Sequence, residues 1–263
     1  MMDDFLQKVT SQKKKDVAAA IKIRPEEALV EAAEAKKDRN PFIERLKPTA
    51  TGDIHVIAEI KRASPSKGDI WAELDPAKLA GAYEKGGAQA ISVLTEPHWF
   101  KGSIADLQAV KAATQLPVLR KDFIVSSYQI FESAVIGADA VLLIAAILSP
   151  EALSRYLNIC RRLNLDALVE VHRPAELEVV KSSGAKLIGI NNRDLRTLKT
   201  DIQIAMDMAK RLDPGQIPVA ASGIRTRADI EKSRNAGIHN FLIGEHLVGA
   251  KDPEKLLKTL RGK

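Results

Sequence analysis

The sequence predicts an α/β fold, a (β/α)8 TIM barrel with an N-terminal helical extension. Apolar, β-branched runs alternate with amphipathic stretches of roughly 10 to 14 residues, which is typical of parallel strands joined by crossover helices. Eight such runs begin 19 to 34 residues apart, which leaves room for one helix between neighbours. A doubly wound sheet usually has about six strands, and no dinucleotide-binding fingerprint follows the first run. A closed barrel accounts for every unit.

Residues 1–48 contain no strand-like run and form the extension. Their pattern predicts a helix, a break at Pro25 and a second helix through about Lys37. We expect the run Lys13-Lys14-Lys15 to be a solvated face of the first helix. A chain of 263 residues is long enough for one large core. We therefore expect one domain over 1–263, with the extension at 1–48 and the barrel at 49–263.

The predicted strands follow in order after the extension, several of them preceded by Gly-Gly or Gly-Ala turns. They are His55–Lys61, Gln89–Thr95, Pro117–Asp122, Ala138–Ala145, Ala167–Val171, Lys186–Asn191, Ile217–Ser222 and His239–Gly244. In such a barrel the chemistry lies at the carboxyl ends of the strands. The last residues of each run are therefore the candidate site.

The charge balance favours an anionic ligand. The chain has 40 lysines and arginines against 34 aspartates and glutamates, a formal net charge of +6, and the two signs interleave along the sequence. Such a surface attracts phosphorylated metabolites as readily as nucleic acid. Only 4% of the residues are aromatic, which argues against a stacking platform for single strands, and no basic stripe or recognition motif is present. We expect no nucleic-acid partner.

Cysteine usage and hydropathy argue against two further classes of protein. Cys160 is the single cysteine, so neither an internal disulfide nor a cysteine-based metal site can form. No histidines or carboxylates show metal-ligand spacing, and we expect no metal. The longest apolar run, Ala140–Leu148, is about half of the roughly 18 residues of a membrane span, and the first residues lack a secretory signal. We expect a cytoplasmic protein with no membrane partner.

Polar side chains follow four of the apolar runs, where packing alone would favour valine or isoleucine. Glu59 and Lys61 share one face of the first run, because side chains alternate along a strand. Lys121, Glu170 and Asn191 end the third, fifth and sixth runs. An isolated Glu-x-Lys is most often a structural ion pair. Two carboxylates, two ammonium groups and an amide at one mouth instead favour general acid–base catalysis, since neighbouring charges shift one another's pKa values.

The seventh and eighth runs end differently, in Ser222-Gly223 and Gly244-Glu245. Glycine lets a backbone approach a ligand closely, and N–H groups at a helix start attract phosphate. The loops after strands seven and eight are the usual phosphate site of these barrels. One such glycine is weak evidence because connecting loops use glycine anyway. Two at the paired positions predict a phosphorylated ligand.

Other residues near the strand ends have less specific patterns. Five apolar residues could wall an aromatic-sized pocket, although a lone one is more often core: Pro65, Phe100, Phe123, Leu142 and Leu195. His55 begins a strand and is expected to be structural. We expect His172 to point away from Glu170, and we assign neither histidine to catalysis.

Four segments together resemble the indole-3-glycerol phosphate synthase family. They read IAEIKRASPS at 57–66, LTE at 94–96, LRKDFI at 119–124 and GINNRDL at 189–195. The likeness extends over about residues 3 to 260, in order, and includes the helical extension. The resemblance implies a tryptophan-biosynthesis enzyme that closes the indole ring of 1-(2-carboxyphenylamino)-1-deoxyribulose 5-phosphate, releasing CO₂ and water without cofactor or metal.

The resemblance also implies a role for each candidate residue. Lys121 resembles the general acid that protonates the substrate carbonyl, and Glu170 and Glu59 resemble the acid–base pair for dehydration. Lys61 would bridge substrate groups, and which lysine serves which step stays open. The other positions would bind substrate: Ser64, Asn191 and Arg193 its carboxylate; Pro65, Phe100, Phe123, Leu142 and Leu195 its ring; Lys61, Ser222, Gly223, Gly244 and the Glu245 amide its phosphate.

One position departs from the family pattern. Where the family usually has Glu-Ser-Gly, this chain has Ala221-Ser222-Gly223. Ala221 faces the same way as Val219 by parity, so a carboxylate is missing from the mouth if that face is interior. A nearby lysine would lose an opposing charge that orients it and keeps it protonated. We expect activity to survive at a lower level, because Lys121 and Glu170 are both present.

Three alternatives remain open on sequence alone. Phosphoribosylanthranilate isomerase, another phosphate-binding barrel, would need a Cys/Asp acid–base pair, and Cys160 lies on a predicted helix away from the mouth. A non-catalytic sensor would keep the phosphate site and lack turnover. Ala221 favours this alternative, because it replaces a carboxylate that the family usually has. A nucleic-acid binder rests on net charge alone. The expected partner is a phosphorylated small molecule, and we expect a monomer, with a weak homodimer as the alternative.

Overall fold

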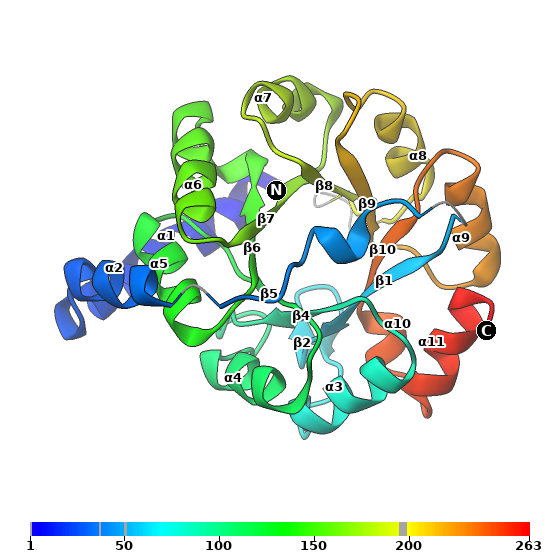
Figure 1. Cartoon of the computed structure of the whole chain (residues 1–263), viewed down its shortest axis with the longest axis horizontal. Helices are drawn as coiled ribbons and strands as arrows, with labels where there is room; N and C mark the ends of the chain where they lie inside the picture. The colour runs from blue at the N-terminus through cyan, green and yellow to red at the C-terminus, as the bar shows by residue number, and fades with distance from the viewer. Residues whose placement is uncertain (1, 37, 50–51, 195–198) are drawn as a thin grey trace.

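The computed structural model describes residues 2–36, 38–49, 52–194 and 199–263. Within them, strands close into a parallel barrel in the order β1-β10-β9-β8-β7-β6-β5-β4, which confirms the predicted fold (Figure 1). The barrel strands are β1 His55–Ile60, β4 Ala90–Leu94, β5 Val118–Lys121, β6 Ala140–Ile144, β7 Asp166–Val171, β8 Leu187–Asn191, β9 Ile217–Ala221 and β10 Asn240–Ile243. Their ends differ from the predicted ones by at most two residues.

Helices follow the strands and form the outer ring in Figure 1. They are α3 Pro76–Lys85, α4 Ile104–Ala113, α5 Ser127–Ile136, α6 Pro150–Arg162, α7 Leu177–Ser182, α8 Gln203–Ala209, α9 Arg227–Arg234, α10 Glu245–Val248 and α11 Pro253–Arg261, with short 3-10 turns η2 Ala145–Ile147 and η3 Pro174–Glu176. Local sequence sets several of their ends. Asp75 caps α3, and Thr226 with Asp229 forms a capping box at α9. A small antiparallel hairpin, β2 Ala63–Ser64 and β3 Gly68–Asp69, follows β1.

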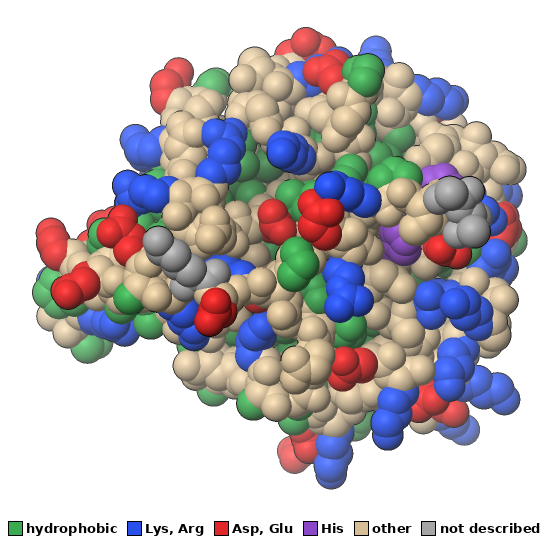
Figure 2. Space-filling view, in the orientation of Figure 1, with side chains coloured by type: hydrophobic (Ala, Val, Ile, Leu, Met, Phe, Trp, Pro, Cys, Tyr) green, Lys and Arg blue, Asp and Glu red, His purple; other side chains and the backbone are tan. Residues whose placement is uncertain are grey.

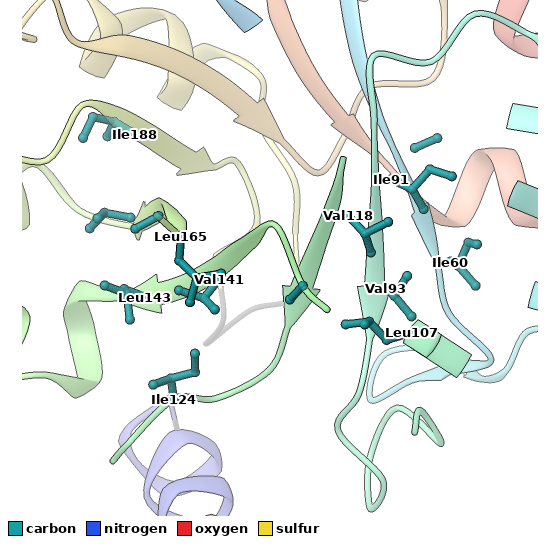
Figure 3. Close-up of a cluster of buried hydrophobic side chains, with 14 of the residues drawn as sticks. Ile60, Ile91, Val93, Leu107, Val118, Ile124, Val141, Leu143, Leu165 and Ile188 are labelled. Carbon is teal, nitrogen blue, oxygen red and sulfur yellow. The ribbon is translucent and has the colours of Figure 1, made fainter. Parts of the chain in front are cut away.

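The hydrophobic core has two layers because side chains alternate along each strand. Outward-facing residues such as Val93 and Val141 pack against the helices and loops around the barrel, including Leu107 and Ile124 (Figure 3). Inward-facing residues such as Leu168 fill the barrel interior. Both faces of each strand are therefore buried, which is why the strands read as continuous apolar runs.

The N-terminal extension contacts both ends of the barrel. It consists of α1 Met2–Ile23, a break at Pro25, α2 Glu26–Ala35 and the 3-10 turn η1 Glu44–Leu46. α1 adds Leu6 to the interior core at the strand ends. The segment after α2 crosses the opposite end of the barrel in Figure 1, where Phe42 and Leu46 are fully buried.

Hydrogen bonds fix this crossing segment to the starts of two strands. The backbone N–H groups of Phe42 and Ile43 both donate to Asp166 Oδ2 at 2.9 Å, and that of Asn40 donates to Asp139 Oδ1 at 2.9 Å. Figure 2 shows this end of the molecule, with basic and acidic side chains interspersed around its rim. The crossing segment therefore closes the end of the barrel opposite the carboxyl ends of the strands.

Two kinds of structure are absent from the described residues. None of the helices there combines the length and the apolarity of a bilayer-spanning segment. No group of three or more His, Cys, Asp or Glu side chains in that part of the chain is arranged to hold a metal ion.

Candidate active site

A pocket of about 650 Å³ opens at the carboxyl ends of the barrel strands. The structure brings together there every predicted site residue that it describes: Glu59, Lys61, Ser64, Pro65, Phe100, Lys121, Phe123, Leu142, Glu170, Asn191, Arg193, Ser222, Gly223, Gly244 and Glu245. Leu195, predicted for the ring wall, lies outside the described residues. The predicted site residues that the structure describes therefore line one pocket, and their roles stay predictions.

Glu59 and Lys61 form an ion pair at the end of β1. Lys61 Nζ donates to Glu59 Oε1 at 2.8 Å, and the Glu59 side chain is only 6% exposed. A Cβ atom at Gly244 would lie 2.3 Å from Glu59 Oε1. A side chain at 244 would displace the Glu59 side chain from this position, a reason for glycine that the sequence did not reveal.

Glu170 stands at the centre of a second cluster. Lys121 Nζ lies 3.4 Å from its Oε2 atom, and Asn191 Nδ2 donates to its Oε1 atom at 3.3 Å. Burial alone would raise the pKa of Glu170, but the charges of Lys121 and His172 and the hydrogen bonds from Asn191 and Lys121 together hold that pKa below its usual range. Burial likewise opposes the charge of Lys121, yet Glu170 and Glu59 outweigh it and raise the Lys121 pKa. The pair is thus an ionised carboxylate beside a protonated ammonium at neutral pH.

The loop after β9 has an unusual backbone conformation. Ser222 and Gly223 have φ values of 68° and 79°, both in the left-handed region. Ser222 is strained there because it has a Cβ atom. Its carbonyl accepts a hydrogen bond from the fully buried Asn192 at 3.0 Å, which holds the loop in place. Strain retained at a pocket is typical of a binding site.

The apolar wall of the pocket includes side chains that the sequence did not single out. The predicted Phe100 and Phe123 lie 6.2 Å apart between ring centroids, and Leu142 is buried beneath the pocket. Phe5 and Leu6 of α1 also line it. They were missed because a helix that folds back over a distant strand end leaves no local pattern in sequence.

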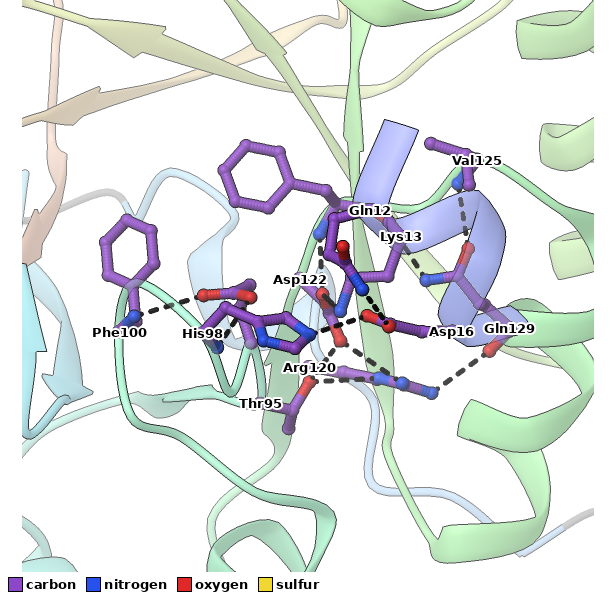
Figure 4. A network of polar contacts seen from close by, with 12 residues as sticks. Gln12, Lys13, Asp16, Thr95, His98, Phe100, Arg120, Asp122, Val125 and Gln129 are labelled. Carbon is purple, nitrogen blue, oxygen red and sulfur yellow. Dashed lines mark hydrogen bonds and ion pairs between the residues drawn. The ribbon is translucent and has the colours of Figure 1, made fainter. Parts of the chain in front are cut away.

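Lys13 is buried, so the prediction that it belongs to a solvated face is wrong. It is 6% exposed, and its Nζ lies 2.8 Å from Asp122 Oδ1 (Figure 4). Thr95 and Arg120 contact the other oxygen of Asp122 at 2.7 and 3.2 Å. The pair joins α1 to the residue that directly follows Lys121. Lys14, next to it, is exposed as predicted.

His172 also differs from prediction. Its Nε2 atom lies 3.3 Å from Glu170 Oε1, and the imidazole lines the pocket. Residues two apart on a strand face the same way, so the expectation that it points away from Glu170 was wrong in its parity. His55, in contrast, contacts Asn240 at 3.0 Å at the start of β1, as a structural histidine would.

Cys160 and Ala221 bear on the alternative functions. Cys160 is 1% exposed on α6 and does not line the pocket, and burial raises its pKa to about 12. A cysteine acid–base group, which the isomerase alternative needs, is therefore missing from the pocket within the described residues. Ala221 is 4% exposed and lies in the interior core with Val219, so the inward parity predicted for it is confirmed.

Comparisons with known proteins agree with this geometry. A family model described as indole-3-glycerol phosphate synthase matches residues 6–260. The chain is 53% identical over 260 residues to indole-3-glycerol phosphate synthase of Desulfosudis oleivorans, covering 98% of this chain and 99% of that protein. It is 49% identical over 261 residues to the same enzyme of Syntrophobacter fumaroxidans, covering 99% and 98%.

A more distant likeness concerns the fold alone. Thiamine phosphate pyrophosphorylase from Pyrococcus furiosus superposes with a TM-score of 0.59 at 16% identity, over 80% of this chain and 95% of that one. The family model and the two relatives, in contrast, extend over nearly the whole sequence. This chain belongs to the indole-3-glycerol phosphate synthase family.

Proposed function

We propose how the residues of the pocket divide the family's reaction among them. That reaction converts 1-(2-carboxyphenylamino)-1-deoxyribulose 5-phosphate to indole-3-glycerol phosphate by ring closure, decarboxylation and dehydration, so the chain is a carboxy-lyase of tryptophan biosynthesis. The observation on which the proposal rests is the contact of Lys121 with Glu170, 3.4 Å apart and both buried in one pocket with Glu59 and Lys61.

Lys121 acts as the general acid in ring closure. Its raised pKa keeps the ammonium protonated at neutral pH. As the aromatic ring carbon attacks the substrate carbonyl, Lys121 gives a proton to the carbonyl oxygen, which becomes a hydroxyl. The carboxyl group on that ring carbon then leaves as CO₂, and its bonding electrons restore the aromatic ring.

Glu170 and Glu59 serve the dehydration. Glu170 is ionised and accepts the proton that the ring-closed intermediate loses. The hydroxyl leaves as water with a proton delivered from the Glu59–Lys61 pair, whose members are in hydrogen-bond contact. Contacts of 3.3 to 3.4 Å around Glu170 are long for hydrogen bonds, as is common in catalytic groups before substrate tightens them.

Substrate binding falls to the rest of the pocket. Ser64, Asn191 and Arg193 hold the carboxylate, and Pro65, Phe100, Phe123 and Leu142 enclose the ring, with Leu195 assigned to the same wall from the sequence. Lys61, Ser222, Gly223, Gly244 and the backbone amide of Glu245 hold the phosphate. Lys67 Nζ lies 2.8 Å from the Glu245 carboxylate, which reduces its repulsion of the phosphate.

Turnover of the substrate, followed by the fluorescence of the indole product, tests the assignment of Lys121. We expect Lys121→Ala to lower kcat by about 10² to 10⁴-fold, the usual contribution of a general acid. Lys85→Ala, which removes an exposed lysine from α3, is the matched control and should keep the parent rate. An active Lys121→Ala would refute the assignment. A parent protein that binds a product analogue tightly without turnover would support the sensor alternative.

We further propose that the protein acts as a monomer in the cytoplasm. Among the described residues, the exposed large apolar side chains are Ile21, Ile23 and Trp71, which is little for a stable interface. The unpaired thiol of Cys160 suits a reducing compartment. Light scattering over a range of protein concentrations tests the first point, since a mass that rises with concentration would indicate the weak homodimer. Cell fractionation tests the second.

A further inference from the structure

His172 is an ionisable residue of the pocket that has no part in the proposed function. His172 follows β7, lines the pocket and has a side chain only 5% exposed. Neither of its ring nitrogens makes a hydrogen bond with any described residue. Buried polar atoms are nearly always hydrogen bonded, so such an imidazole in a pocket indicates a role other than packing.

The position of the ring relates it to Glu170. His172 Nε2 lies 3.3 Å from Glu170 Oε1, close enough for an ion pair when the imidazole is protonated. The same oxygen accepts the amide of Asn191 at 3.3 Å, while Lys121 lies 3.4 Å from the other oxygen. The carboxylate is thus flanked by a cation on one side and a titratable imidazole on the other.

We propose that His172 is a positioning residue for Glu170: the imidazole beside Oε1 holds the carboxylate in place and favours its proton-accepting form. This inference rests on the role proposed above for Glu170. It extends that role, because His172, the residue directly after β7, then helps to set the pH range over which Glu170 accepts a proton.

The surroundings of β7 leave few other charges to play this part. Neighbouring β6 contributes only apolar side chains and β8 contributes the neutral Asn191. On the outer face, the buried side chains of α6 are Leu153, Tyr156, Leu157 and Cys160. In η3, Glu176 accepts the backbone N–H of His172 at 2.7 Å, and Arg173 is exposed. Across the pocket, Lys121 faces Glu170, and Glu59 acts on Lys121.

The electrostatics of Glu170 support the geometry. After burial, which acts to raise the pKa of Glu170, Lys121 and then His172 lower it the most. Lys121 keeps its charge throughout the range in which a carboxylate titrates. Replacing His172 therefore removes one charged neighbour of Glu170 and keeps the other, Lys121, which is also the proposed general acid.

The test is the pH profile of kcat/KM for His172→Gln. The acid limb of that profile reports protonation of the essential base in the unliganded enzyme. His172 lowers the pKa of Glu170, so its loss should move the limb to higher pH by about one unit, with kcat/KM on the limb falling about tenfold. The plateau at higher pH should fall by less than about threefold, because Lys121 and Asn191 still contact the carboxylate there.

Control variants separate this role from a structural one. His98→Gln also removes an imidazole paired with a carboxylate, that of Asp16. His98 does not line the pocket, so the limb of this variant should stay in place. Circular dichroism and thermal melting check the folding of each variant. His172→Asn, with a smaller neutral amide, gives a second reading of the limb where glutamine disturbs the packing.

The outcomes distinguish the proposed role of Glu170 in dehydration from the positioning role of His172. A limb that stays in place in both folded His172 variants overturns the inference, as does an equal loss of kcat/KM at every pH. Glu170→Gln is measured in parallel. If it keeps full turnover, the proposed function of Glu170 fails; if it loses turnover while the His172 limb stays in place, only the inference about His172 fails.

Discussion

Ala221 places a methyl group where β9 meets the pocket. It pairs in register with Asn191 on β8, and its side chain faces the barrel interior. A glutamate there would bring a further carboxylate to a pocket that Lys61 and Lys121 already line. Since a buried carboxylate helps to orient a neighbouring ammonium and keeps it protonated, its absence should lower the rate without abolishing it.

We therefore expect Ala221→Glu to raise kcat/KM by about tenfold, or roughly 1.4 kcal/mol of transition-state stabilisation. Steady-state kinetics by indole fluorescence measure it. Ala221→Gln has the same shape without the charge and should give no such increase. Unchanged kcat and KM in Ala221→Glu would show that a carboxylate at this position contributes nothing in this chain.

Residue-scale prediction from sequence succeeded where strand parity was applied correctly. Glu59 and Lys61 were placed on one face and do form an ion pair, and Ala221 was placed with Val219. The same rule puts His172 beside Glu170, and that prediction was made with the wrong parity. Asn191 and Lys121 were found because a polar residue interrupts an apolar run, a signal that His172, just beyond its strand, gives less clearly.

At the scale of elements, α1 forms part of the pocket and is held there by a buried ion pair. Phe5 and Leu6 line the pocket, and Lys13 reaches Asp122 at the end of β5 (Figure 4). A run of three lysines gives no sign of which one is buried, because that depends on how the helix is rotated against a barrel far along the chain. The amphipathic pattern predicted the helix and could not predict its partner.

Lys13→Met should lower the free energy of unfolding by about 2 to 3 kcal/mol, because Asp122 stays buried with one of its cations lost. KM should rise by about fivefold with a smaller change in kcat, since the wall made by Phe5 and Leu6 loosens while Lys121 and Glu170 remain. Urea denaturation and steady-state kinetics measure the two effects.

The neighbouring lysine supplies the control. Lys14→Met makes the same substitution one residue further along α1, on an exposed side chain, and should change stability by less than about 0.5 kcal/mol. Equal effects of the two variants would mean that the Lys13–Asp122 pair does not fix α1. A stability loss in Lys13→Met with KM unchanged would mean that the pair supports the fold and leaves the pocket wall untouched.

At the scale of the whole molecule, the barrel was predictable because each of its units is local. Each strand with its helix spans a few tens of residues, and the alternation of apolar runs and amphipathic stretches repeats along the chain. The closure of the far end was not predictable. Phe42 donates to Asp166, 124 positions away, and nothing near Phe42 in the sequence indicates such a partner.

These long-range contacts make the extension and the barrel one structure, and we expect residues 1–263 to unfold as a single domain. Leu6 and Val9 of α1 and Phe42 and Leu46 of the crossing segment share one core with the barrel interior. A unit that shares its core with another cannot unfold alone without exposing apolar surface on both. When a protein unfolds as one cooperative unit, its unfolding transition has the same midpoint whichever spectroscopic signal follows it.

The two tryptophans allow a direct measurement. Trp99 lies with its ring centroid 6.0 Å from that of Phe5 on α1, so its fluorescence follows the docking of the helix. Trp71 is 44% exposed and is replaced by phenylalanine to remove its signal. In Trp71→Phe, the urea transition followed by Trp99 fluorescence should coincide with that followed by far-ultraviolet circular dichroism, which the barrel dominates. A fluorescence transition at lower urea would instead show that α1 undocks first and that the extension is a separate folding unit.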